Sequence, residues 1–250
     1  MADAAGYPEF LRLVGHPLRW RLLTELAGSD LRVRELMERV GAPQNLVSYH
    51  LRVLRAGDLV SAARSTFDAR DSYYHLDLDR CAEGLVGTAA ALHPALRTGP
   101  PSPAPPVRSG TPSVLFVCSG NSARSPLAEA MVRRRTGGRV RVSSAGTRPK
   151  DRIHPHVARV LREEYGVDLA RQAPQPLDLD TGHSFDRVVT LCDRAREHVA
   201  GVAGERLVHW SVPDPADAAE DDRRGGYRRF VAVAADIDTR VRHLLPTLHL

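Results

Sequence analysis

The sequence contains few of the residues that mark several common protein classes. Its 250 residues include only three cysteines, Cys81, Cys118 and Cys192, which are too few and too scattered for a disulfide framework. No apolar run of about 18 residues is present, so a membrane-spanning helix is excluded. The first residues lack both a basic start and an apolar core, so we expect no signal peptide. These absences favour a protein of the reducing cytoplasm.

An excess of charge of one sign is also missing from the first part of the chain. Residues 1–99 carry 12 arginines and 12 acidic residues, whereas residues 110–250 carry 22 basic and 18 acidic residues. Lys150 is the only lysine. The formal net charge of +5 therefore does not by itself predict nucleic-acid binding, and any DNA contact must come from locally placed arginines.

A proline-rich segment divides the chain. Six of the fifteen residues from 98 to 112 are prolines, which remove backbone donors and forbid a helix or a central strand. We predict a semi-rigid spacer at residues 98–112, with one domain at residues 1–97 and another at residues 113–250. The pattern of apolar residues changes across the segment, which favours a spacer over a surface loop within one domain.

Before the spacer, the apolar periodicity is mostly helical. It predicts three helices, two strands of a β-hairpin wing and a closing helix, at residues 16–27, 33–40, 44–56, 59–63, 72–78 and 79–92. In the third of these helices we expect the buried side chains to be Leu46, Val47, Leu51 and Leu54. Two helices joined by the short turn at residues 41–43 form a helix-turn-helix unit.

After the spacer, strands and helices alternate. Short apolar runs predict strands at residues 114–117, 140–143, 185–191 and 207–210. Amphipathic stretches predict helices at residues 127–135, 154–165 and 227–245, with a further short helix after the third strand. This alternation predicts an α/β domain with a doubly wound parallel sheet.

The most informative segment is the loop at residues 118–125, the cysteine loop, which follows an apolar strand and precedes a helix. Gly120 and Asn121 can adopt the positive φ that a phosphate cradle needs. Backbone N–H groups and a bidentate arginine would then bind a tetrahedral oxyanion through Ser119, Gly120, Asn121, Ser122, Ala123 and Arg124. Such surroundings favour the thiolate form of Cys118 as a nucleophile, to which Ser125 can donate a hydrogen bond.

Residues 114–130 (VLFVCSGNSARSPLAEA) resemble the signature of the low-molecular-weight tyrosine phosphatase superfamily, which includes thiol-coupled arsenate reductases. The resemblance covers essentially residues 113–248, and residues 144–147, 188–193 and 210–215 resemble later segments of the family. It implies that Asp214 is the mobile-loop acid that protonates or orients the leaving oxygen. The His154-Pro155-His156 triplet resembles an ordinary helix start of the family, so no metal site is expected.

Two features favour a reductase over a phosphatase. An aryl phosphate needs aromatic walls to stack its ring, and residues 145–150 and 214–217 supply none. The segment at residues 190–192 resembles the resolving-cysteine segment of the reductases, which implies that Cys192 attacks the sulfur–arsenic adduct.

Two departures from the family constrain that mechanism. Val199 stands where three-cysteine reductases carry their last thiol, and Ala123 replaces a cysteine that phosphatases usually place beside the arginine. An internal relay of three thiols is therefore impossible in this domain. Either an external partner such as thioredoxin reduces a Cys118–Cys192 disulfide directly, or a small thiol resolves the adduct and Cys192 is a buried bystander.

Residues 8–92 resemble the arsenic-responsive (ArsR-type) winged-helix repressors, on residues 16–23 (HPLRWRLL) and 47–60 (VSYHLRVLRAGDLV). The side chains expected on or near the exposed face of the second helix of the motif, and so at DNA, are Gln44, Asn45, Ser48, Tyr49, His50, Arg52 and Arg55. Relatives are dimers, which implies a homodimer with two recognition helices one DNA turn apart. The alternative is a charged face on a protein-interaction domain.

Relatives that sense thiophilic metals often carry Cys-Val-Cys on the first helix of the motif. The matching stretch here is Arg32-Val33-Arg34, and Cys81 alone cannot build a trigonal arsenite site. One hypothesis is that the ligand or redox state of the second domain is communicated to the first through the spacer. An operator affinity unchanged by arsenate, arsenite or oxidation would argue against it.

The sequence therefore predicts a bifunctional protein, in which a DNA-binding repressor is fused to a thiol-dependent arsenate reductase. Its expected partners are operator DNA, an arsenate or phosphate oxyanion, and an external thiol reductant, with no cofactor. A phosphatase tethered to a DNA-binding domain and a non-catalytic oxyanion-sensing repressor stay open as alternatives. The presence of Cys118, Arg124 and Asp214 weighs against the sensor, because binding alone needs no nucleophile or acid.

Overall fold

The chain divides into two compact units, Met1–Ala104 and Pro105–Leu250, each with its own apolar core. The computed structural model describes residues 8–93, 96, 111–169, 172–178, 184–216 and 223–248, without the side chains of residues 202 and 223–225. Most of the predicted spacer, residues 98–110, lies outside the described residues. Within the described residues, no helix is both long and apolar enough to span a membrane.

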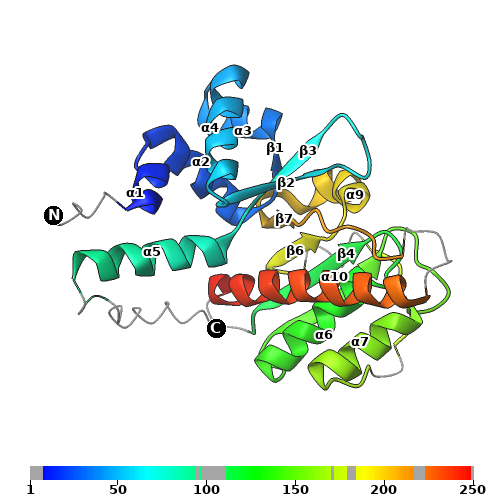
Figure 1. The fold of residues 1–250 in the computed structure, drawn as a ribbon. Coiled ribbons are helices and arrows are strands. Elements are labelled where there is room, and N and C mark those ends of the chain that lie inside the picture. Colours follow the sequence, from blue (N-terminus) through cyan, green and yellow to red (C-terminus); the bar gives the residue numbers. More distant parts are fainter. Residues whose placement is uncertain are drawn as a thin grey trace. The chain divides into compact units, whose positions relative to one another are not determined.

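The first unit combines five helices and three short strands among its described residues (Figure 1). The helices are α1 (Glu9–Val14), α2 (Pro17–Gly28), α3 (Val33–Val40), α4 (Gln44–Ala56) and α5 (Leu78–Leu92). The strands are β1 (Leu31–Arg32), β2 (Val60–Arg64) and β3 (Ser72–Leu76), in the antiparallel order β1-β3-β2. The predicted helix-turn-helix and wing are confirmed, whereas α1 and β1 are elements that the sequence did not indicate.

Local chemistry explains where these helices begin and end. The His16 side chain accepts a hydrogen bond from Leu18 N at 3.1 Å, and Pro17 occupies the first position of α2, where its missing N–H costs nothing. Gly41 ends α3 in the left-handed conformation, with φ of 62°. The turn to α4 therefore needs only three residues.

The core of the first unit is formed by the apolar faces of α2, α3 and α4. Val47, Leu51 and Leu54 are buried as expected, but the expectation for Leu46 is wrong, because its side chain is 40% exposed. Leu46 lies about 100° around the helix from Val47, at the edge of the buried stripe. The contiguous apolar pair in the sequence could not show which of the two residues faces inward.

The second unit is an α/β domain built on a four-stranded parallel sheet. Its strands are β4 (Ser113–Cys118), β5 (Arg141–Gly146), β6 (Arg187–Thr190) and β7 (Leu207–His209), in the order β5-β4-β6-β7. Its described helices are α6 (Arg124–Thr136), α7 (Pro155–Tyr165), α9 (Asp193–Ala203) and α10 (Arg223–Leu244), with short 3₁₀ turns η2 (Gly204–Arg206) and η3 (Leu245–Leu248). The predicted doubly wound sheet is confirmed.

The strand order places the cysteine loop at a switch point of the sheet. The chain leaves β4 to form β5 on one side and then crosses to form β6 on the other. In open α/β sheets, ligands bind outside the carboxyl end of the strand where the order reverses, and Cys118 is the last residue of that strand. Every residue of β4 is buried, and α10 packs against α6 and α7 (Figure 1), so the loop stands on a rigid base.

Helix α6 begins three residues earlier than the sequence indicated. The apolar pattern predicted a start at Leu127, but the helix begins at Arg124. The cysteine loop therefore leads directly into the helix, and the amides of the first turn point toward the loop. This N-terminus contributes partial positive charge where an oxyanion would bind.

Candidate active site and DNA-binding face

The backbone of the cysteine loop depends on one residue with positive φ. Asn121 has a φ of 44°, as expected, but Gly120 is not in the left-handed region, which corrects the sequence interpretation. A side chain at position 120 would instead approach Lys150, whose Cγ would lie 3.2 Å from the added Cβ. At Gly146, on the adjacent strand, an added Cβ would lie 2.9 Å from Asn121 N and from Ser119 O. Gly146 is therefore required for the close approach of two backbone segments.

Cys118 accepts hydrogen bonds at the centre of the loop. Its Sγ lies 3.2 Å from the donor Asn121 N and 3.0 Å from Ser125 Oγ. Ser125 Oγ already accepts a hydrogen bond from Asn121 Nδ2 at 2.9 Å, so its own proton is available to the sulfur. Hydrogen-bond donors placed around a sulfur atom can stabilise the negative charge of an attacking thiolate.

Asn121 organises the loop in a way that sequence reasoning missed. Its buried side chain donates to Ser125 Oγ and to Ser144 Oγ, each at 2.9 Å. Its Oδ1 accepts a hydrogen bond from Gln175 N at 2.7 Å. One amide group thus ties the loop to β5 and to the segment that follows α7. The only signal in the sequence was that asparagine tolerates positive φ.

Arg124 lies where an oxyanion would be clamped. Its Nη2 donates to Asp214 Oδ2 at 2.6 Å and its Nη1 donates to Val212 O at 3.0 Å. Its Nε is buried and has no hydrogen-bond partner among the described residues. The fold thus brings the acid and the arginine singled out in the sequence, 90 residues apart, into one ion pair.

Cys192 lies beside the same loop. Val117 pairs with Thr190 in the sheet, so Cys118 and Cys192 follow the carboxyl ends of adjacent parallel strands. Cys192 is the N-cap residue of α9, and its Sγ lies 3.2 Å from Ser119 Oγ. Both cysteines are buried free thiols. Val199, on α9, is buried in the position where some relatives were expected to carry a third thiol.

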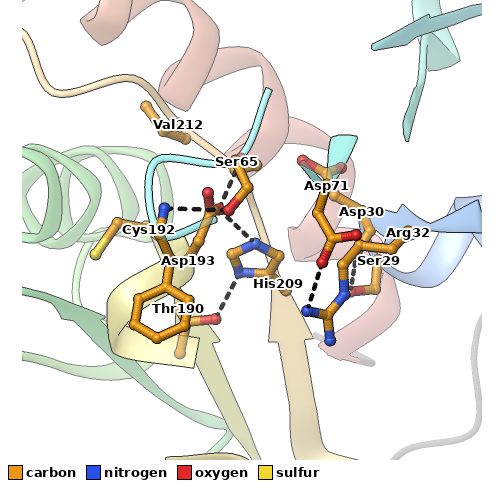
Figure 2. Close-up of polar contacts among 12 residues, drawn as sticks. Ser29, Asp30, Arg32, Ser65, Asp71, Thr190, Cys192, Asp193, His209 and Val212 are labelled. Atoms are coloured by element: carbon orange, nitrogen blue, oxygen red, sulfur yellow. Dashed lines mark hydrogen bonds and ion pairs between the residues drawn. The ribbon is translucent and has the colours of Figure 1, made fainter. Parts of the chain in front are cut away.

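A buried polar network below Cys192 was not indicated by the sequence. His209 Nδ1 lies 2.9 Å from Thr190 Oγ1, and its Nε2 lies 3.2 Å from Asp193 Oδ1, as Figure 2 shows. Ser211 donates to the same carboxylate oxygen at 2.8 Å. The network joins the start of α9 to the end of β7, and so holds Cys192 and the chain that leads to Asp214 in register.

The described walls of the site contain no aromatic ring. Residues 147–150 and 214–216 carry none, and Trp210 is buried against Phe116 with ring centroids 5.8 Å apart. His154 stacks on Phe230 with centroids 4.4 Å apart, and its backbone N–H donates to Ser122 O. Burial, followed by the charge of His156, lowers the pKa of His154. The backbone of His154 therefore holds the cysteine loop through its hydrogen bond to Ser122 O.

The His154–His156 pair forms a helix start. His154 Nδ1 accepts a hydrogen bond from His156 N at 3.2 Å and so caps α7. Among the side chains that the structure describes, no group of three His, Cys, Asp or Glu residues could hold a metal ion.

Six of the seven side chains expected at DNA are at least partly accessible on α4. Those exposed are Gln44, Asn45, Tyr49, Arg52 and Arg55, and Ser48 is half-buried. The expectation for His50 is wrong, because this side chain is only 4% exposed and packs on the His16 ring at 4.3 Å. Burial, followed by the charges of His16 and Arg19, lowers the pKa of His50.

Comparison with known families agrees with both sites. The model of the low molecular weight phosphotyrosine protein phosphatase family matches residues 113–249, more than half of the chain. The model described as the bacterial regulatory protein, arsR family, matches residues 16–62, a segment that includes α2, α3 and α4.

Several individual proteins are similar to this chain. An arsenate reductase from Bacillus licheniformis is 30% identical over 136 residues, which are 54% of this chain and 96% of the relative. A glutaredoxin arsenate reductase from Synechocystis is 35% identical over 41% of this chain and 77% of its own length. A solved low molecular weight protein tyrosine phosphatase from T. tengcongensis is 20% identical, with a TM-score of 0.47, and is matched over 54% of this chain and 99% of its own.

The family match and the named relatives identify an enzyme of the arsenate reductase or low molecular weight phosphatase kind. The same chain also carries the helix-turn-helix that matches the arsR family model at residues 16–62. Through residues 113–249, this chain belongs to the low molecular weight phosphotyrosine protein phosphatase family.

Proposed function

We propose that this protein is a DNA-binding transcriptional regulator fused to a thiol-dependent arsenate reductase. The observation that carries the choice of reductase is the contact of Cys192 Sγ with Ser119 Oγ at 3.2 Å, next to the nucleophile Cys118. A phosphatase needs one thiol at this place, whereas reduction of arsenate needs two electrons, which a pair of thiols can supply. The relatives named arsenate reductase support the same choice.

The first step is attack of the Cys118 thiolate on arsenic. Arg124 and the amides of residues 119–123 bind the oxyanion, and the free Nε of Arg124 provides a further donor to it. Asp214 forms an ion pair with this arginine; when the oxyanion takes its place there, the carboxylate takes up a proton from solvent and passes it to the departing oxygen. A sulfur–arsenic bond forms, a hydroxyl group leaves as water, and arsenic remains pentavalent.

The second step transfers two electrons to arsenic. The Cys192 thiolate attacks Cys118 Sγ, and the sulfur–arsenic bond breaks with its electron pair remaining on arsenic. Arsenite leaves, and a Cys118–Cys192 disulfide is formed. The Ser125 hydroxyl, 3.0 Å from Cys118 Sγ, can donate a hydrogen bond to this sulfur and so stabilise its negative charge before it attacks arsenic.

The disulfide must then be reduced from outside the domain. Val199 is buried in α9 and carries no thiol, so no third cysteine of this unit takes over the disulfide. We propose an external protein reductant of the thioredoxin or glutaredoxin class, or a small thiol, as the source of the two electrons.

Steady-state turnover on arsenate and on an aryl phosphate tests this function. Arsenate is supplied with thioredoxin, with glutaredoxin or with a small thiol, and Cys118→Ser and Cys192→Ser are assayed beside the wild type. We expect arsenate turnover that is lost in Cys118→Ser and falls by about 100-fold or more in Cys192→Ser with a protein reductant.

Two other outcomes of these assays would favour the alternative functions, a phosphatase or an oxyanion-sensing repressor. Aryl phosphate hydrolysis without arsenate turnover would establish a phosphatase. Phosphate transfer would use the same three residues, Cys118, Arg124 and Asp214. Neither activity would favour an oxyanion-sensing repressor. Undiminished turnover in Cys192→Ser would remove this thiol from the mechanism.

The first unit supplies the regulatory half of the proposal. Its exposed side chains on α4 match the expected DNA-contacting set apart from His50, with Arg52 and Arg55 placed to reach phosphates. We propose that it binds operator DNA as a homodimer. The division into a DNA-binding domain at residues 1–97, a spacer at 98–112 and an enzyme domain at 113–250 is part of this proposal.

A further inference from the structure

The first unit contains no thiol pair with which to bind trivalent arsenic. Residues 32–34 are Arg32, Val33 and Arg34, and Cys81 is the only cysteine of this unit. Cys81 is partly buried on α5, where burial and the charge of Asp77 raise the pKa of its thiol to about 11. A single protonated thiol cannot chelate a thiophilic ion, because thiols bind such ions as thiolates and in sets.

The remaining two cysteines of the chain, Cys118 and Cys192, lie at the ends of neighbouring strands in the second unit. Adjacent parallel strands are about 4.8 Å apart, and Cys118 and Cys192 stand at the carboxyl ends of the adjacent strands β4 and β6. Leu191 N donates to Val117 O at 2.7 Å, which fixes the two strand ends against each other. The Ser119 hydroxyl, 3.2 Å from Cys192 Sγ, belongs to the residue that follows Cys118.

The surroundings of the two sulfur atoms suit a bridging ion. Asn121 N donates a hydrogen bond to Cys118 Sγ, and Cys192 is the N-cap residue of the 11-residue helix α9, so an N–H donor or a helix N-terminus lies at each sulfur. In Figure 2, the Cys192 sulfur points away from the His209–Asp193 pair, so that network does not engage it.

We propose that the reduced Cys118–Cys192 pair is a binding site for trivalent arsenic. This chain would then bind trivalent arsenic in its enzyme domain and not in its helix-turn-helix domain. Two thiols replace two hydroxyl groups of arsenous acid, with release of two water molecules and no change in oxidation state. The third position on arsenic keeps a hydroxyl group or takes a small thiol. The inference shares its two cysteines with the proposed function but requires no turnover.

Phenylarsine oxide is the probe that tests this site, because its arsenic takes two thiols. The full chain, fully reduced, is titrated calorimetrically beside Cys118→Ser, Cys192→Ser and the matched control Cys81→Ser. We expect one equivalent to bind the wild type and Cys81→Ser with the same affinity. Loss of either active-site thiol removes the chelate and weakens binding on the order of 100-fold or more.

A second measurement uses the wild type alone, in case a variant fails to fold. Bound phenylarsine oxide protects Cys118 and Cys192 from iodoacetamide but leaves the rate at Cys81 unchanged, and a competing dithiol restores the reactivity of both. Binding of equal affinity in Cys192→Ser, or protection of Cys81, overturns the proposal.

Parallel turnover assays separate this inference from the reductase. A Cys192→Ser protein that still reduces arsenate but no longer retains phenylarsine oxide keeps the binding site and removes Cys192 from the catalytic mechanism. A Cys192→Ser protein that loses turnover but binds phenylarsine oxide like the wild type keeps Cys192 in the catalytic mechanism and overturns the binding site. The two ideas therefore fail on different results.

Discussion

At the residue scale, the conformation of the cysteine loop depends on side chains that take no part in the reaction themselves. Asn121 connects the nucleophile's hydrogen-bond donor Ser125 to Ser144 and to the backbone of Gln175. Ser119 joins the loop to the second thiol. These contacts fix the conformation of the cysteine loop. The position of Cys118 therefore depends on the neighbouring side chains as well as on strand β4.

Replacement of Asn121 with alanine tests that dependence. It leaves Gln175 N without its acceptor and two serine hydroxyls without their donor, at a cost of about 1–3 kcal/mol for each buried group left unsatisfied. We expect a lower melting temperature of the enzyme unit and a fall in arsenate turnover. Asn45→Ala, at an exposed position on α4, is the control and should change neither. Unaltered melting of Asn121→Ala would contradict the structural role.

His50 provides a pH-dependent prediction for the first unit. Its folded-state pKa is lowered from the ordinary value of 6.5 by burial and by the charges of His16 and Arg19. Between the folded and unfolded pKa values the unfolded chain binds more protons, so stability rises with pH in that window and is lost as pH falls below 6.5.

A phenylalanine at position 50 keeps a ring against His16 and cannot be protonated. Amide hydrogen exchange of α2 and α4, measured from pH 7.5 to pH 5 after correction for the intrinsic rates, should show a smaller loss of protection for His50→Phe than for the wild type. Superimposable profiles would show that His50 does not govern acid stability.

At the element scale, the site is made by the ends of strands. Cys118 ends β4, Gly146 ends β5 and Cys192 follows β6, so three neighbouring strands each contribute one residue to the same edge. The order of the sheet brings them together although they are far apart in sequence. Helices α6 and α9 then direct their N-termini toward this edge.

Gly146→Ala tests the close packing of β5 against the cysteine loop. The new methyl group would lie 2.9 Å from two backbone atoms, which cannot move as a side chain could, so we expect destabilisation of about 1–3 kcal/mol and reduced arsenate turnover. Gly201→Ala in α9 meets nothing within 4 Å and should be neutral or stabilising by up to about 1 kcal/mol. Comparable melting temperatures for the two variants would show that the loop adapts.

At the scale of the whole molecule, a regulatory unit and an enzyme share one chain. Residues 1–99 have no net charge, so attraction to DNA must come from a local group of arginines on α4. Arg52 and Arg55 are both exposed there. The enzyme unit carries the remaining positive charge, which suits the oxyanion that we propose it binds.

Alanine at Arg52 or Arg55 should weaken DNA binding about equally for operator and unrelated sequences. Each phosphate contact removed lowers the slope of log affinity against log salt by about 1. Fluorescence anisotropy over a range of salt concentrations measures that slope. Arg80→Ala, at a distant exposed position on α5, is the control, and an equal effect there would contradict a specific role for α4.

Local patterns in the sequence determined most of the elements and the chemistry of the loop. Apolar periodicity of 2 and 3.6 residues is a property of neighbouring residues, so the helix-turn-helix, the parallel strands and the Cys-x5-Arg loop could be found without coordinates. The role of Cys118 and Arg124 follows from their types and spacing. The starts of α6 and α10 and the small strand β1 were missed, and for β1 the reason is that its pairing partner β3 lies about 40 residues further along the chain.

Only the tertiary structure decided which distant groups meet. The ion pair of Arg124 with Asp214, the contact of Ser119 with Cys192 and the buried position of His50 join residues whose separation in the sequence carries no signal. Sheet order sets the first two, because parallel strands bring their carboxyl ends to one edge whatever the length of the connections. Packing on His16 sets the third, because a polar residue at the edge of an apolar stripe can face either way.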